Sequence, residues 1–253
     1  GVTGSADDGE VEDYKIEITA AEELVLDFGA NDNVIVLSDM RAGQIINGSA
    51  PGTVPPRYAG GIGPEGLREI DAFVRAGGTL VTVNGSSQLA IDELHLPVSN
   101  VIQGVSRDEY FAGGAIVELL VDPSHPVMSG MEERSKVFIG GSPVFTTEEG
   151  FEGHVLAKYS ENGSPLMSGY YLGEEHVQGY AAALDVKYGD GRVVLLGFRP
   201  QWRGQPFGTF KVFFNAALYS SEVAAQAPEN DDFWTKPEKP ESEEEEGDGN
   251  GRR

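Results

Sequence analysis

Hydrophobic and polar positions follow two different periods in the first half of the chain. Val34–Leu37 and Thr79–Val83 are uninterrupted apolar and β-branched runs, typical of strands that are buried on both faces. Between them, Pro64–Ala76 carries apolar residues at helical spacing, which predicts a helix that ends at Gly77. A second helix is expected over Ser87–Leu94. This alternation predicts a parallel sheet with helices on both faces.

The second half is richer in strands. Tyr188–Gly191 is a hairpin signal between the last two strands, and 207–219 predicts a closing helix that turns Phe213, Phe214 and Leu218 toward the core. The strands are expected at 115–121, 136–139, 154–159, 166–169, 181–188 and 192–197. We therefore predict one folded domain over residues 14–220, which begins with a short strand at Lys15–Thr19 and a helical stretch at Ala20–Leu26.

Both ends of the chain are acidic. Residues 1–13 and 221–253 are poor in large apolar residues, so we expect a disordered lead and a disordered tail. The net charge of -23, from 18 basic and 41 acidic residues, argues against binding to nucleic acid or to anionic lipid. No apolar run approaches the roughly 20 residues of a membrane span.

The residue types exclude several kinds of site. The sequence has no cysteine, so it offers no disulfide, no thiolate nucleophile and no cysteine-based zinc site. The histidines show no His-x-x-Glu or His-Glu-x-x-His pattern, and no metal site is expected from them. Of His95, His125, His154 and His176, we interpret His125 as a turn residue and the last two as strand or loop residues.

Three loops follow predicted strands, at Ser38–Gly63, Asn84–Ser87 and Phe198–Pro206. Ligands of open α/β sheets bind outside the carboxyl ends of the strands, and a long loop without regular structure, such as the first, is commonly functional. The candidate ligand-binding residues in these loops are Arg41, Asn84, Ser86, Arg199 and Arg203.

Two of these candidates have a second interpretation. Arg199 and Arg203 either hold a carboxylate or phosphate between them or pair with acids of the chain itself. Ser86 stands where a nucleophile elbow would place its serine, but the stretch Asn84-Gly85-Ser86-Ser87-Gln88 lacks Gly-x-Ser-x-Gly, and a helix cap is the alternative.

The stretches Thr79–Leu94 and Gly197–Gln201 resemble the class I glutamine amidotransferases. The resemblance implies a flavodoxin-like parallel sheet with flanking helices, to which this chain adds β-strands in its second half. In that family a hydrophobic strand precedes Cys-x-Gly-x-Gln, and Phe-His-Pro-Glu supplies the base and its orienting acid. Here Asn84 stands at the cysteine position, Arg199 at the histidine and Gln201 at the glutamate, while Gln88 is retained. Neither thiolate attack nor base assistance is available from these replacements, so amidotransferase activity is not implied.

Two longer strings resemble a narrower group. Ile46–Gly63 and Gly197–Asn215 are similar to motifs of an amidotransferase-like domain appended to bacterial secreted zinc carboxypeptidases. The resemblance implies an upstream peptidase domain as partner, zinc bound in that absent domain and none in this chain, and an extracellular or periplasmic location. The chain begins at Gly1, not Met, which favours a C-terminal fragment or a shortened version.

Three functions follow from these observations. The first is a non-catalytic accessory domain of a zinc metallocarboxypeptidase, without catalytic residues of its own. The second is a module that binds a small carboxylate or sugar. The third is a hydrolase that uses Ser86.

Overall fold

A computed structural model of the chain describes residues 33–204, 207–228 and 230–238. The expected acidic lead, the strand at Lys15–Thr19 and the helical stretch at Ala20–Leu26 lie outside the described residues. The strands are β1 (Val34–Leu37), β2 (Thr79–Val83), β3 (Val98–Asn100), β4 (Phe111–Val121), β5 (Arg134–Ile139), β6 (Phe145–Thr147), β7 (Gly153–Lys158), β8 (Leu166–Leu172), β9 (Ala181–Tyr188) and β10 (Gly191–Leu196). The helices are α1 (Ala42–Asn47), α2 (Gly63–Arg75), α3 (Ser87–Glu93), α4 (Phe210–Ala217) and α5 (Ser221–Ala224), with short 3-10 turns between them.

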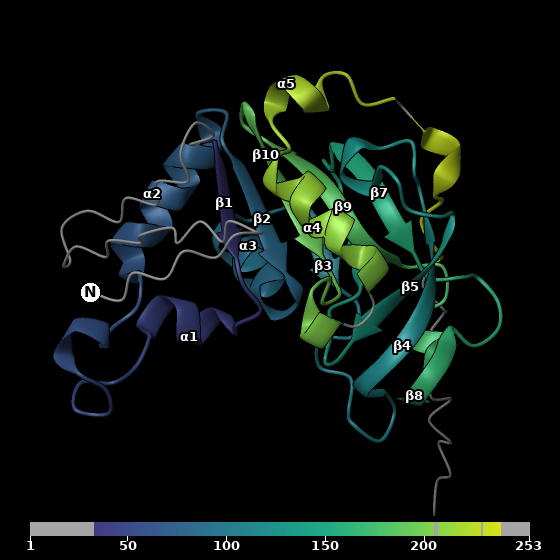
Figure 1. Cartoon of the computed structure of the whole chain (residues 1–253), viewed down its shortest axis with the longest axis horizontal. Coiled ribbons are helices and arrows are strands. Elements are labelled where there is room, and N and C mark those ends of the chain that lie inside the picture. Colours follow the sequence, from purple (N-terminus) through teal and green to yellow (C-terminus); the bar gives the residue numbers. More distant parts are fainter. Residues whose placement is uncertain (1–32, 205–206, 229, 239–253) are drawn as a thin grey trace, which may run out of the picture.

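One mixed sheet forms the centre of the molecule, in the order β1-β2-β10-β9-β7-β4-β5 (Figure 1). Pairing is parallel among β1, β2 and β10 and antiparallel from β10 onward. The expected flavodoxin-like parallel sheet with added strands is thus a mixed sheet in which only β1, β2 and β10 pair in parallel. The physical reason is connection length: the tight turn between Tyr188 and Gly191 joins β9 to β10, whereas parallel neighbours need a crossover of about a dozen residues or more.

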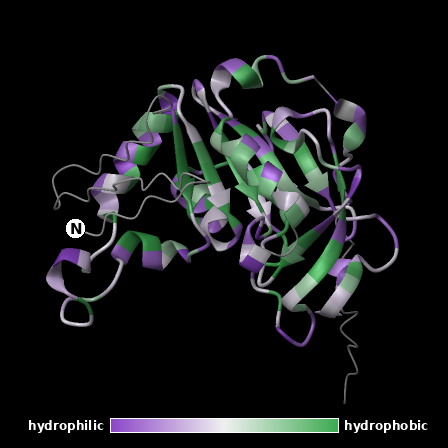
Figure 2. Cartoon of the chain, viewed as in Figure 1, coloured by the Kyte–Doolittle hydropathy of each residue, from purple (hydrophilic) through white to green (hydrophobic). Residues whose placement is uncertain are grey.

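Helices cover both faces of the parallel part, as predicted. Successive strand residues alternate between two apolar clusters, so Leu80 and Val193 meet α2 and α3 while Val81 and Val194 meet α4. All five residues of β2 are buried, which confirms the interpretation of Thr79–Val83 as a strand covered on both sides. Figure 2 shows the hydrophobic residues concentrated in these central strands. None of the described helices is long and apolar enough to cross a membrane.

The closing helix differs from its prediction in which face is buried. Val212, Ala216 and Tyr219 are buried, whereas Phe214 and Leu218 are 61% and 64% exposed. The helix begins at Phe210 rather than Phe207. Its buried side follows from Val212 to Ala216, four residues on, and to Tyr219, three residues after that. The prediction that Phe214 and Leu218 face the core was therefore wrong, because both lie on the exposed side of the helix.

The folded part extends beyond the expected end at residue 220. Ser221 begins α5, and its Oγ donates to the carbonyl oxygen of Gly77 at 2.9 Å. Farther on, Trp234 Nε1 donates to the carbonyl oxygen of Gly179 at 2.8 Å, and Asn230 donates to Asp122 at 3.0 Å. The tail predicted from residue 221 thus starts too early, because an acid-rich composition hides a few anchoring side chains.

A buried polar network ties the end of α4 to the sheet. The Asp185 carboxylate on β9 is fully buried and receives Arg192 Nε at 2.9 Å and the Tyr219 hydroxyl at 2.6 Å. His125 Nδ1 accepts from the Val127 amide, so in neutral His125 the proton lies on Nε2, 3.3 Å from Asp185 Oδ2. Such a network stabilises only while every member keeps its partner.

The network also sets the charge state of Asp185. Burial raises the pKa of this carboxyl, but the hydrogen bonds from His125, Arg192 and Tyr219 outweigh burial and hold it below its ordinary value. The carboxylate therefore stabilises the fold above the pKa of an unfolded Asp, and this contribution is lost as the pH falls through the folded-state value.

We predict that Tyr219→Phe lowers the free energy of unfolding by about 1.5–3 kcal/mol, because it removes a donor from a buried carboxylate. Tyr159→Phe is the matched control, since Tyr159 is equally buried and its hydroxyl has no hydrogen-bond partner among the described residues. That variant should be neutral or stabilising. Urea denaturation measures both, and an equal loss in the two variants would contradict the role given to the network.

Candidate functional site

The turn between β2 and α3 lies at the carboxyl end of the parallel strands, where the sequence placed its elbow. Asn84 follows β2 directly, has a left-handed φ of 53° and is 2% exposed. Asn is one of the few residues other than glycine that tolerates this conformation, and strained turns of this kind are used to present a side chain above a sheet. The backbone therefore has the form of an elbow, with an amide as its side chain.

Both ends of the Asn84 side chain are already bonded. Its Nδ2 donates to Asp39 Oδ1 at 3.0 Å, and its Oδ1 accepts from the Ser142 hydroxyl at 2.5 Å. Asp39 Oδ1 also accepts from the Gly85 amide at 3.1 Å. The Asn84 side chain is thus held in place by two other loops.

Arg199 completes the group from the end of β10. Its Nε lies 2.5 Å from Asp39 Oδ2, as an ion pair without the geometry of a well-directed hydrogen bond. Its guanidinium also lies over the Trp202 ring, 4.6 Å from the ring centroid, and Arg203 approaches the same ring at 5.4 Å. Of the two interpretations of Arg199, internal pairing with an acid is the one that the structure contains.

The remaining candidates from the sequence do not join this group. Gln201, at the position of the family's orienting acid, is exposed, and Arg41 is exposed at the start of α1. Ser86 Oγ is buried: it accepts from the Val83 amide and lies 3.0 Å from the carbonyl oxygens of Leu37 and Val83. The Ser86 hydroxyl therefore secures the turn and is closed to a substrate.

The long loop at 38–63 is ordered, contrary to the expectation of a structureless segment. It contains α1 and is closed by Gly60 N–H donating to Ser49 at 2.9 Å and Ile62 N–H donating to Ile45 at 3.0 Å. The backbones approach so closely that a Cβ on Gly48 would lie 1.6 Å from the Gly60 carbonyl oxygen. The glycines of this motif therefore serve close backbone packing.

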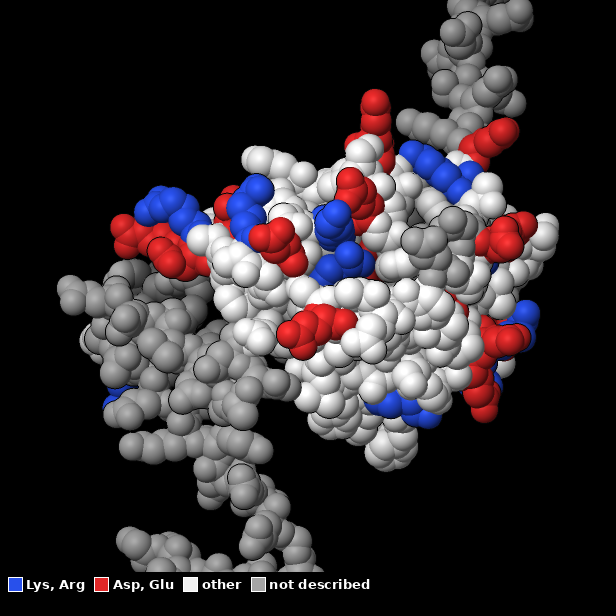
Figure 3. Space-filling view, turned by 90° about the horizontal axis from the view of Figure 1, so that it is seen from above, with Lys and Arg blue, Asp and Glu red and all other residues white. Residues whose placement is uncertain are grey.

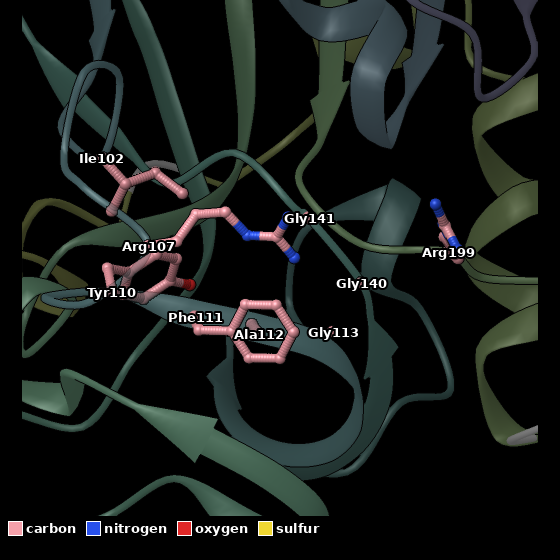
Figure 4. A pocket seen from close by; sticks show the side chains of 9 residues that line it. All are labelled: Ile102, Arg107, Tyr110, Phe111, Ala112, Gly113, Gly140, Gly141 and Arg199. Carbon is pink, nitrogen blue, oxygen red and sulfur yellow. The ribbon is translucent and has the colours of Figure 1, made fainter.

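A hollow of about 460 Å³ opens beside Arg199 and was not expected from the sequence (Figure 4). Its lining comes from the loop before β4, the start of β4, the Gly140-Gly141 turn and Arg199. A second hollow of about 280 Å³ shares Ile102 and Gly141 with the first and reaches Gly85 and Gln88 beside the elbow. The two hollows are therefore neighbours, and the first, which is lined by Arg107 and Arg199, is called the groove below.

Three residues far apart in sequence form a separate cluster. One ligand atom each of His125, His154 and Asp185 lies within 4.8 Å of the others, which the histidine spacing gave no reason to expect. These residue types suit zinc, but both Asp185 oxygens contact Arg192, and His125 uses both ring nitrogens in the network described above. Burial lowers the pKa of His154, and Arg192 adds a fixed positive charge. The cluster fits a structural ion-pair network better than a cation site.

Comparisons with known proteins give similarities of fold at low identity. A cytoplasmic protein of Salmonella typhimurium is 15% identical with a TM-score of 0.45, covering 74% of this chain and 71% of that chain. A protein of Thermoplasma acidophilum assigned as a GMP synthase subunit is 10% identical with a TM-score of 0.38, covering 64% and 65%. The β-galactosidase of Bacillus circulans sp. alkalophilus is 18% identical with a TM-score of 0.37, covering 61% of this chain and 20% of the enzyme.

No protein-family model matches the sequence, and no curated protein matches it. The chain is a mixed α/β protein with a curled mixed sheet and flanking helices.

We predict that Asn84→Ala lowers the free energy of unfolding by about 3 kcal/mol, because it removes two buried hydrogen bonds and strains a left-handed position. Asn84→Gly loses the same bonds without the strain and should be about 1 kcal/mol more stable than the alanine variant. Chemical denaturation of both variants measures the difference. Equal stability of the two would show that the left-handed backbone carries no strain.

Proposed function

We propose that this chain is a non-catalytic, amidotransferase-like accessory domain. The observation that supports the proposal most directly is the state of Asn84: it occupies an elbow, yet its amide is bonded at both ends to Asp39 and Ser142. Amidotransferase chemistry needs a nucleophile there and a base that titrates near neutrality opposite it. An amide and an ion-paired guanidinium supply neither.

We further propose, from the two longer motif strings, that this domain belongs to a secreted zinc carboxypeptidase. Their resemblance to the domain appended to secreted zinc carboxypeptidases favours a peptidase domain as the natural partner, zinc held by that domain, and an extracellular or periplasmic location. The first string begins at the end of α1 and forms the glycine-closed loop, and the second runs from the end of β10 into α4. The second string contributes Arg199, which pairs with Asp39 beside the elbow, and we expect this string to support that edge of the sheet.

A hydrolase based on Ser86 is the weaker alternative. The Ser86 hydroxyl is fully buried and bonded to the backbone of β2 and of Leu37, so a substrate carbonyl has no approach to it. Thr82 and Ser87 bond to each other below it at 2.9 Å, which extends the hydroxyl network into the core.

The activity test uses the purified chain with three probes: glutamine with ammonia detection, a fluorophosphonate, and a carboxypeptidase substrate with added zinc. We expect no turnover and no labelling. Asn84→Ala and Ser86→Ala serve as controls, because a genuine activity at the elbow must depend on one of them. Ammonia release abolished by Asn84→Ala, or labelling abolished by Ser86→Ala, would overturn the non-catalytic assignment.

The partner is tested separately by sequencing the gene upstream of the codon for Gly1. A peptidase domain that carries His-x-x-Glu and is joined in frame ahead of Gly1 is the expected result. A different domain in that place would overturn the peptidase partnership and leave the non-catalytic assignment to the activity test.

A further inference from the structure

The hollow beside Arg199 is cationic in a strongly acidic protein. Two arginines and no acid lie among its nine lining residues, which are Ile102, Arg107, Tyr110, Phe111, Ala112, Gly113, Gly140, Gly141 and Arg199. The whole chain carries 41 acids against 18 bases, and on the face seen in Figure 3 acidic and basic side chains are interspersed. A groove wall without any carboxylate is therefore a local reversal of charge, which attracts anions.

The two arginines differ in what already neutralises them. Arg199 is paired with Asp39, whereas Arg107 has no carboxylate within ion-pair distance among the described residues. The guanidinium of Arg107 lies over the Phe111 ring, 5.0 Å from its centroid, and extends over the hollow toward Gly141 (Figure 4). Stacking occupies a face of the guanidinium and leaves its in-plane N–H donors for a planar anion.

The remaining walls fit an apolar group beside that anion. Ile102, Tyr110 and Phe111 line one side, and the Gly140-Gly141 turn lines the other without side chains. Tyr110 is held by its hydroxyl, which lies 3.2 Å from the Tyr171 hydroxyl, and the two rings meet edge to face at 5.7 Å. The hollow thus has a fixed apolar wall and, in Arg107, one arginine that no described carboxylate pairs, and its volume lies within the usual range for a small-molecule site.

We propose that this groove binds a small organic carboxylate that carries an apolar or aromatic group, with Arg107 as the residue that holds the carboxylate. The planar guanidinium matches a carboxylate in a two-point interaction, and the apolar group lies against Tyr110 and Phe111. The site is distinct from the elbow: Asn84 does not line the hollow, and Arg199 contributes to its wall while it remains paired with Asp39.

The test is a titration of the full chain followed by NMR of its backbone amides. The probes are N-acetyl-phenylalanine, its neutral amide of nearly the same shape, and inorganic phosphate. We expect the acid to shift the amide signals of Gly113, Gly140 and Gly141, and to bind about tenfold or more tightly than the amide, because one charge-assisted contact is lost. Phosphate should bind more weakly than the acid, since it has no apolar group.

Variants assign the effect to one side chain. Arg107→Ala should weaken binding of the acid about tenfold or more, and Arg107→Lys should give an intermediate loss because an ammonium lacks the planar fork. Arg57→Ala is the matched control: Arg57 is also exposed and stacks over an aromatic ring, Tyr58, at 4.8 Å, but it does not line the groove. It should bind the acid as the unmodified chain does.

Several outcomes would overturn the proposal. Equal binding of the acid and its amide would show that the carboxylate is not recognised. Phosphate binding as tight as that of the acid would show that the apolar group contributes nothing to binding. An unchanged affinity for the acid in Arg107→Ala, in a variant whose other amide signals are native, would show that Arg107 does not hold the carboxylate. Because each readout is binding, failure here leaves the non-catalytic assignment untouched, and activity at the elbow would leave this groove untouched.

Discussion

The carboxylate of Asp39 joins the carboxyl ends of the three parallel strands. It follows β1, accepts from Asn84 and Gly85 after β2, and faces Arg199 after β10. These segments lie far apart in the chain, and Asn84 lies 45 positions after Asp39. Because one carboxylate oxygen accepts two hydrogen bonds and the other faces the Arg199 guanidinium, the three loops are held relative to one another. The turn at Asn84, the position of Arg199 and the wall of the neighbouring groove depend on that arrangement.

This constraint explains why the turn at Asn84 has the backbone form of an elbow without a reactive side chain. In a catalytic elbow the strained turn presents a reactive atom, whereas here the same turn presents an amide that binds two neighbouring loops. Asparagine suits the position for two reasons: it tolerates the left-handed backbone, and its side chain offers both a hydrogen-bond donor and an acceptor. Arg199 beside Asp39 supplies a cationic partner for the second carboxylate oxygen. Asn84 and Arg199 both act through one acid, Asp39.

The sequence predicted what depends on local patterns. Thr79–Val83 was recognised as buried on both faces, and Tyr188–Gly191 as a hairpin, because each signal lies within a few residues. It could not identify Asp39 or Ser142 as partners of Asn84, since neither carries a motif and contacts across 45 and 58 residues leave no spacing to detect. Arg107 was missed because its significance depends on the fold: it lines the groove and has no ion-pair partner among the residues that the structure describes.

Other differences have the same origin. The predicted hairpin at Tyr188–Gly191 already requires β9 and β10 to be antiparallel, and the antiparallel half of the sheet begins at this pair. The anchors of residues 221–238 are single side chains, such as Trp234, within a segment whose composition indicates solvent. The cluster of His125, His154 and Asp185 brings together residues from three separate segments. It does not suit a cation, because the surrounding polar network already uses the ligand atoms of Asp185 and His125.

The most direct measurement of the account is a double-mutant cycle on Asp39 and Arg199. The free energy of unfolding is measured by urea denaturation for the unmodified chain, Asp39→Ala, Arg199→Ala and the double variant. The account predicts a coupling of about 1–2 kcal/mol, and a larger loss for Asp39→Ala than for Arg199→Ala, because the aspartate also holds Asn84 and Gly85. Additive losses, or a larger effect of the arginine, would contradict the claim that one carboxylate holds the three strand ends together.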